Sequence, residues 1–160
     1  METDQHLFSI YLDDHRAGAA VGQARARWMA DRYGADPGFE ELIEVCRAIE
    51  ADVDDLDRLR AQLGVGGGRL KWALALLMER LGRLKPNGRL VRRSPLSRLL
   101  EIELLSAGVA AKRALWHATM SAWGTDELAG VDLRRLGDRA DEQLECLRRL
   151  HDRAAASLGS

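Results

Sequence analysis

The sequence is poor in aromatic residues and in proline. Only 5% of its 160 residues are aromatic and only 3 are proline, whereas β-sandwiches and β-barrels need β-branched and aromatic residues with frequent turns. It contains no apolar run near the ~20 residues that a membrane span requires. Its polar first residues also lack the layout of a signal peptide. We therefore expect neither an all-β fold nor a membrane-spanning protein, and we expect a cytoplasmic location.

Cysteine is scarcer still, with 2 residues. Cys46 and Cys146 match no metal-binding or redox spacing. Both fall within long helical patterns, and free cysteine is often buried. We expect two buried free thiols.

What the sequence does contain is typical of a single helical domain over residues 1–160. Hydrophobic residues make up 46% and charged residues 31% of the chain, a balance found in soluble globular proteins. Apolar spacing predicts long amphipathic helices over about 6–33, 36–63, 94–122 and 132–158. The predicted boundaries rest on Asp36-Pro37 and Ser94-Pro95 as starts and on Gly34, Gly64 and Gly124 as stops.

The links between these helices predict the topology. Short links join the first helix to the second and the third to the fourth, which makes two antiparallel hairpins. Residues 64–94 form a long crossover that contains a short helix over 69–84. We therefore expect an all-α four-helix bundle with one long connection, the ferritin-like arrangement.

The apolar spacing also predicts which side chains face the core. For the first helix these are Leu7, Ile10, Tyr11, Ala17, Val21, Ala24 and Trp28. For the second they are Leu42, Cys46, Ile49, Val53, Leu56, Leu59 and Leu63. For the fourth they are Leu133, Leu136, Ala140, Leu144, Leu147 and Ala154.

Three stretches carry a resemblance to a family. They are YLDDHRAG at 11–18, GRLKPNGR at 82–89 and RSPLSR at 93–98. They resemble an uncharacterised family of short helical proteins of the actinobacterial, high-GC type, which is itself similar to the ferritin-like superfamily in helix layout. The resemblance spans most of the chain and implies the fold, but it implies no activity.

A metal site of unusual composition is one hypothesis for function. Di-iron bundles use Glu-x-x-His on two helices, and neither such motif is present here. Asp14 and Glu103 lie between apolar positions and are expected to face inward, while Glu50 and His151 lie beside the apolar stripes. Together they would form a sparse carboxylate site suited to Fe or Mn. The alternative is that these groups pair with Arg25, Lys112 or the backbone, because buried charges need partners.

The middle of the chain is strongly basic. Residues 64–98 hold nine basic side chains and one acidic, whereas residues 1–63 hold 14 acidic and 7 basic. The candidate anion or partner contacts are Arg69, Lys71, Arg83, Lys85, Arg89, Arg92 and Arg93. Nucleic-acid phosphates and an anionic membrane surface are two interpretations. We favour a third, in which the crossover packs on the acidic first two helices.

The crossover also predicts oligomerisation. Residues 72–78 are apolar on nearly every face, and such a helix must be buried. Another chain is a natural cover, with Trp72, Leu76 and Leu77 as the expected contacts of a homo-oligomer.

Because no catalytic triad or phosphate-binding loop is complete, we expect a non-catalytic bundle that acts through protein association. A degenerate Fe or Mn protein or oxidoreductase is the first alternative, and an anionic membrane or nucleic-acid binder is the second.

Overall fold

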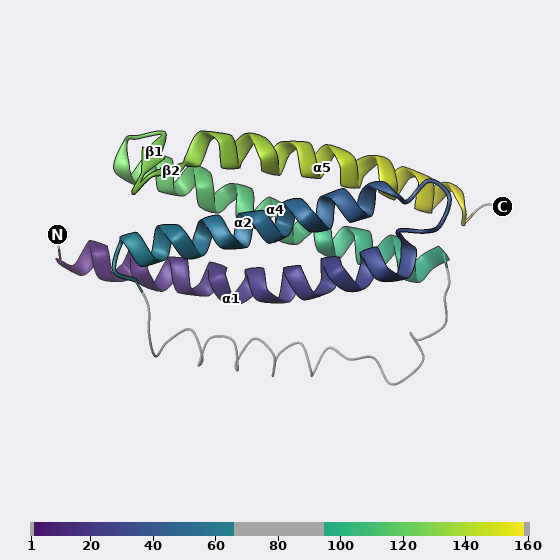
Figure 1. The fold of residues 1–160 in the computed structure, drawn as a ribbon, viewed down its shortest axis with the longest axis horizontal. Helices are drawn as coiled ribbons and strands as arrows, with labels where there is room; N and C mark the ends of the chain where they lie inside the picture. Colours follow the sequence, from purple (N-terminus) through teal and green to yellow (C-terminus); the bar gives the residue numbers. More distant parts are fainter. Residues whose placement is uncertain (1, 66–94, 159–160) are drawn as a thin grey trace.

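A computed structural model describes residues 2–65 and 95–158, with side chains from His6 onward. The described elements are α1 (Glu2–Tyr33), α2 (Glu41–Gln62), α4 (Pro95–Trp123), β1 (Glu127–Leu128), β2 (Val131–Asp132) and α5 (Leu133–Ala156) (Figure 1). Apart from one very short strand pair, the described residues form long helices, which confirms the all-α class. None of the helices in these ranges is both long and apolar enough to cross a membrane.

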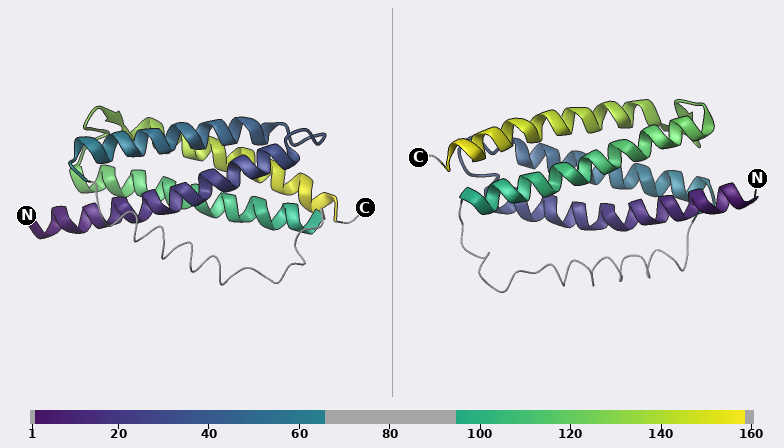
Figure 2. Two further views of the ribbon diagram at one scale, coloured as in Figure 1. Left: turned by 60° about the horizontal axis from the view of Figure 1, so that its bottom comes forward. Right: turned by 180° about the vertical axis from the view of Figure 1, so that it is seen from behind.

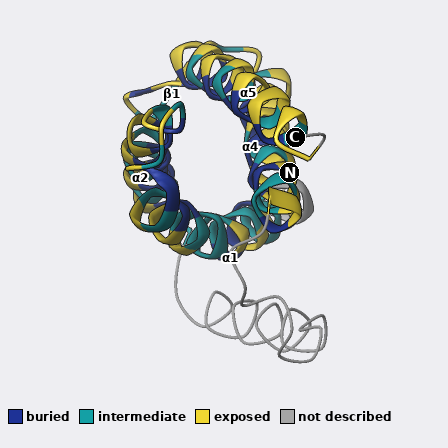
Figure 3. Ribbon diagram, turned by 90° about the vertical axis from the view of Figure 1, so that its right-hand side faces the viewer, coloured by how far each residue is buried: buried dark blue, intermediate teal, exposed yellow. Residues whose placement is uncertain are grey.

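The helices close into a ring. Helix α1 packs on α2 and α4, and α5 packs on the same two helices from the other side (Figure 3). Helices α1 and α5 run in one direction along the bundle, and α2 and α4 run in the opposite direction (Figures 1 and 2). Every neighbouring pair is therefore antiparallel, and α2 ends at the opposite end of the bundle from the start of α4.

Glycine ends several helices where the sequence predicts it. Gly64 follows α2 with φ +68°, and Gly124 follows α4 with φ +63°. Both φ angles lie in the left-handed region, which costs glycine little because it has no Cβ. At the start of α5, one Asp132 carboxylate oxygen accepts a hydrogen bond from the backbone N–H of Arg135 at 2.9 Å. Asp132 is therefore an N-cap, in agreement with the predicted start.

The predicted start of α2 at Asp36-Pro37 is wrong. The helix begins at Glu41, and the preceding residues form turns in which the N–H of Phe39 donates to the carbonyl of Asp36 at 3.0 Å. Gly38 has φ +83°, so a right-handed helix cannot continue through it. The buried Phe39 side chain is instead part of the core.

A small β-hairpin, absent from the sequence predictions, joins α4 to α5. Glu127 pairs with Asp132 and Leu128 with Val131 in an antiparallel ladder. Ala129 and Gly130 at its tip have φ 53° and 72°, and two successive positive φ angles are typical of the type I′ turn that suits a two-residue hairpin. The hairpin brings the buried Val131 onto the core at this end of the bundle.

The apolar stripes of α2 and α5 are confirmed. Every predicted inward residue on these two helices is buried or half-buried. The predicted stripe of α1 is right only in part. Ala17 is buried as predicted, but Leu7 is 58% and Trp28 39% exposed, while Leu12 and Met29 are fully buried. Helix α1 carries apolar side chains on more than one face, so its spacing fits two alternative phases.

Apart from Gly64 and Val65, the predicted crossover lies outside the described residues. This applies to its short helix over 69–84, to the apolar residues 72–78 with their expected oligomer contacts, and to the seven basic candidate residues. These remain predictions from the sequence.

Candidate functional site

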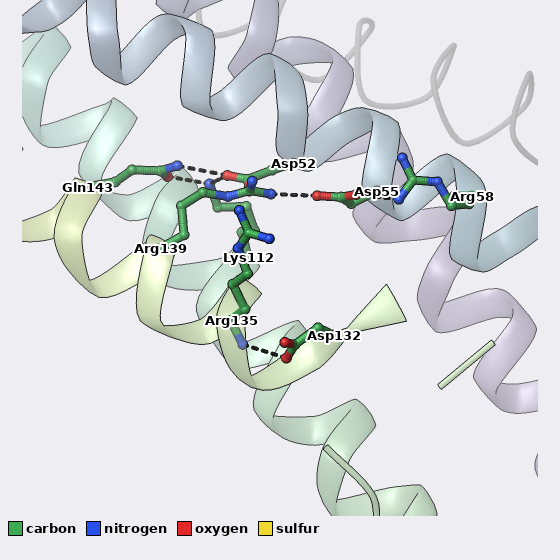
Figure 4. Close-up of polar contacts among 8 residues, drawn as sticks. All are labelled: Asp52, Asp55, Arg58, Lys112, Asp132, Arg135, Arg139 and Gln143. Carbon is green, nitrogen blue, oxygen red and sulfur yellow. Dashed lines mark hydrogen bonds and ion pairs between the residues drawn. The ribbon is translucent and has the colours of Figure 1, made fainter. Parts of the chain in front are cut away.

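A group of four polar side chains crosses the middle of the bundle. We call Asp52 on α2, Lys112 on α4, and Arg139 and Gln143 on α5 the Asp52 layer (Figure 4). Asp52 Oδ1 accepts from Arg139 Nε at 2.6 Å, and Oδ2 accepts from Gln143 Nε2 at 2.8 Å. Lys112 Nζ donates to Asp52 Oδ2 and to Gln143 Oε1. Helices α4 and α5 thus direct their donors at one carboxylate on α2.

The Asp52 layer separates two apolar clusters. Asp52 is 2% and Gln143 4% exposed. On one side lies a cluster that includes Met29, Ile49 and Leu147. On the other lies a cluster that includes Leu12, Leu56 and Trp116. The Asp52 layer is therefore the polar boundary between these two halves of the core.

The surroundings of Lys112 and Arg139 shift their pKa values in opposite directions. Desolvation lowers the pKa of Lys112, and the charge and hydrogen bond of Asp52 only partly oppose that shift. Burial also works against the charge of Arg139, but the Asp55 hydrogen bond and the Asp52 charge raise its pKa overall. The layer and its neighbour Asp55 hold two negative charges, on Asp52 and Asp55, and two positive charges, on Lys112 and Arg139. Buried ions are tolerated when they are paired in this way.

A polar pocket of about 380 Å³ opens beside this layer, between α2, α5 and the hairpin. Its floor holds the ion pair of Arg139 Nη2 with Asp55 Oδ2 at 2.6 Å, and Arg58 Nη1 donates to Asp55 Oδ1 at 2.8 Å. We call it the α2–α5 pocket. It is lined by Ala51, Asp54, Asp55, Arg58, Gly130, Val131, Asp132, Arg135, Leu136 and Arg139.

The four metal candidates do not gather into one site. Glu103 Oε1 and His151 Nε2 form a surface pair 3.2 Å apart, while Glu50 pairs with Arg27 and Asp14 is exposed. Within residues 2–65 and 95–158, no group of three or more His, Cys, Asp or Glu side chains is placed to hold a metal ion. The expectation that Asp14 and Glu103 face inward is wrong, because both assignments used the wrong phase of their helices.

The buried acidic group on α1 is Asp13, the neighbour of Asp14. Asp13 is 5% exposed and accepts a hydrogen bond from Arg60 Nη2 at 2.5 Å. Arg60 also donates to Asp57 at 3.3 Å, and Asp57 in turn accepts from Arg16 at 2.6 Å. This network joins α1 to α2.

The Asp52 layer has a sequence signal that was missed. Asp52 lies three residues after Ile49 and four before Leu56, which is a core position on a helix. Lys112 stands in the same relation to Val109 and Trp116, which are both buried. Polar residues at core positions on two helices, with opposite charges, predict a buried ion pair.

Glu41 forms a third charged cluster at the start of α2. It accepts from Arg149 at 2.7 Å, from Arg153 at 3.0 Å and from the Cys146 thiol at 3.2 Å. These donors lower its pKa from 4.5 to about 2. Burial raises the pKa of the half-buried Cys146, and the hydrogen bond and charge of Glu41 raise it further, to about 11. This thiol is therefore a poor nucleophile at neutral pH. Cys46 is buried, and both cysteines are free.

The lowered pKa of Glu41 predicts a change in acid stability. In the unfolded chain Glu41 binds its proton near pH 4.5, so its contribution is complete above that pH and is lost as the pH falls toward 2. Because its side chain is 35% exposed, we expect Glu41→Gln to cost about 1 kcal/mol at pH 7 and almost nothing at pH 2. Urea unfolding of both proteins across this range measures the difference, and a constant difference would contradict the assignment.

Each charged cluster described above is built from contacts within the chain. The Asp52 layer, the Asp13–Arg60 network and the Glu41 cluster all join different helices. The α2–α5 pocket combines a cavity with charged side chains. No protein-family model, curated protein or solved structure matches this chain.

Proposed function

We propose that this protein is a non-catalytic helical bundle with a ferritin-like layout that acts through protein association. The up-down-down-up order of its helices supports the layout (Figure 1). One observation carries the function: Leu96, Leu100 and Leu104 on α4 are 51%, 42% and 63% exposed. Large exposed apolar side chains that share one surface are typical of interaction sites.

These leucines belong to one continuous apolar stripe. Residues four apart lie on the same side of a helix, and the stripe continues through exposed alanines to the far half of α4. We call it the α4 outer face. Its members are Leu96, Leu100, Leu104, Ala107, Ala111, Ala114 and Ala118. The stripe contains no charged side chain, so little polar surface would have to lose its water on association.

A second copy of the chain is the partner that this face fits best. Its large side chains lie in one half of the stripe and its small ones in the other. When two α4 helices pair antiparallel about Ala107, Leu100 of one copy faces Ala114 of the other. Leu96 then faces Ala118 in the same way. A two-fold contact of this kind is self-complementary, because each copy supplies both halves.

The size of the face sets the expected strength of the dimer. Residues 96–118 span ~33 Å of helix, and with a helix width of about 10 Å the two faces bury roughly 650 Å². Stable interfaces bury about 1,200–2,000 Å². We therefore expect a weak, concentration-dependent dimer rather than a permanent one.

Sedimentation equilibrium over a wide range of protein concentrations tests this proposal. We expect reversible dimerisation of the wild-type chain, and we expect Leu104→Glu to be monomeric, because two copies would bring uncompensated carboxylates into an apolar contact. Leu7→Glu is the control, since Leu7 is also exposed but lies on α1. A wild-type chain that stays monomeric at roughly millimolar concentration, or an equal effect of both variants, would rule out this face.

A further inference from the structure

The α2–α5 pocket carries an inference that does not depend on the α4 outer face. We propose that it binds a small dipolar molecule with one carboxylate and one ammonium group, in the chemical class of free amino acids. Some charged groups in this pocket already have partners within the chain, and others do not.

Several charged groups of the pocket neutralise one another. Arg139 is held between Asp52 and Asp55, with donor–acceptor distances of 2.6 Å to each. Arg58 uses only its Nη1 for Asp55, at 2.8 Å, so its other donors remain open. These contacts fix the floor of the pocket, and Figure 4 shows Arg58 beside Asp55 on α2.

Two charged side chains of the pocket have no such partner. Arg135 lies on the first turn of α5 and Asp54 on α2, and both are exposed. Among the hydrogen bonds and ion pairs of the described residues, none involves the Arg135 guanidinium or the Asp54 carboxylate. Figure 4 shows Arg135 reaching from α5 toward the Asp55–Arg139 pair. One open cation and one open anion therefore border the same cavity.

The pocket also has a defined shape. The hairpin turn at Ala129 and Gly130 brings Gly130 and Val131 to one wall. Val131 and Leu136 are both 3% exposed and contribute apolar surface from the core. The volume of about 380 Å³ lies near the lower end of the range for small-molecule sites, about 300–1,000 Å³.

The open charges select the class of ligand. A guanidinium offers a planar pair of donors that match a carboxylate, and Arg135 and the open side of Arg58 supply this. A carboxylate such as Asp54 accepts from an ammonium group. The lining holds three Asp and three Arg side chains, so a simple anion would meet the repulsion of Asp54 and Asp132. A molecule with one carboxylate and one ammonium group can pair with Arg135 and with Asp54 at the same time.

An NMR titration of the full-length chain with a ladder of unbranched amino acids tests this inference. The ladder runs from glycine through β-alanine, γ-aminobutyrate and 5-aminovalerate to 6-aminohexanoate, so the separation of the two charges increases stepwise. We expect one member to bind more tightly than its neighbours and to shift the amide signals of Gly130 and Val131. Binding should weaken about tenfold in Arg135→Gln and in Asp54→Asn, as expected for loss of one charged contact.

Arg134→Gln is the matched control, because Arg134 lies next to Arg135 but pairs with Asp126 at 2.6 Å. Arg135 and Asp54 make no side-chain contacts that folding needs, so their variants should keep the amide spectrum of the folded chain. The inference is overturned if no member of the ladder binds at roughly 10 mM, or if Arg135→Gln binds as tightly as Arg134→Gln. It is also overturned if the carboxylic acid of the same length without the amine binds equally well, which would identify a simple anion site.

Discussion

Replacing Asp52 with alanine should lower the free energy of unfolding by about 3–5 kcal/mol, because it leaves the half-buried cations Lys112 and Arg139 without their shared carboxylate. Asp52 receives donors from α4 and α5 at once. Its side chain is only 1% exposed, so water cannot replace the lost acceptor. Chemical denaturation of the purified variant measures the loss.

Asp54→Ala is the matched control for this experiment. Asp54 lies on the same helix but is exposed, and substitutions of this kind usually change stability by less than about 0.5 kcal/mol. Similar losses for the two variants would show that Asp52 is not a buried acceptor. Exchanging the whole Asp52 layer for apolar residues of similar volume should restore much of the loss, because it removes the uncompensated charges as well.

Arg60→Met should also destabilise the fold strongly, by about 3–5 kcal/mol. It leaves the Asp13 carboxylate, 7% exposed in its side chain, without its cation. Protonation relieves an unpaired buried carboxylate, so the loss should be largest at neutral pH and smaller in acid. Unfolding measured at two pH values separates this charge effect from a loss of packing.

Arg47→Met is the control for Arg60→Met. Arg47 is on the same helix and forms an ion pair with Glu44 that is about two-thirds exposed on both sides. Such pairs contribute less than about 1 kcal/mol. Equal losses for the two arginine variants, or a loss for Arg60→Met that does not depend on pH, would contradict the buried pair.

The positions of the helices were accessible from the sequence because local signals determine them. The glycines at 64 and 124 follow helix ends at the predicted places. The start of α2 was missed because Asp36 and Pro37 are good starting residues in isolation, while the turn that contains them is held by the burial of Phe39. That burial depends on other helices, so no local pattern reports it.

The candidate site was harder to predict than the helices. Asp14 and Glu103 were selected from the apolar spacing of α1 and α4, the two helices with apolar side chains on more than one face. Because a single helix of this kind fits two phases, a polar residue can be assigned to the wrong side. The polar residues of the clearly amphipathic α2 and α5, namely Asp52, Arg139 and Gln143, were the better candidates.

The Asp52 layer also has a consequence for how the helices align along the bundle axis. The contacts between leucines on neighbouring helices are similar before and after one helix slides by one turn, about 5.4 Å. Apolar contacts alone therefore discriminate weakly between such alignments. The layer contributes contacts from three helices at a single level. If α5 slid by one turn so that Arg139 took the place of Gln143, then Gln143 would move to the level of the buried Leu147 and enter apolar surroundings. A few polar atoms thereby select one axial alignment from several that the leucines would accept.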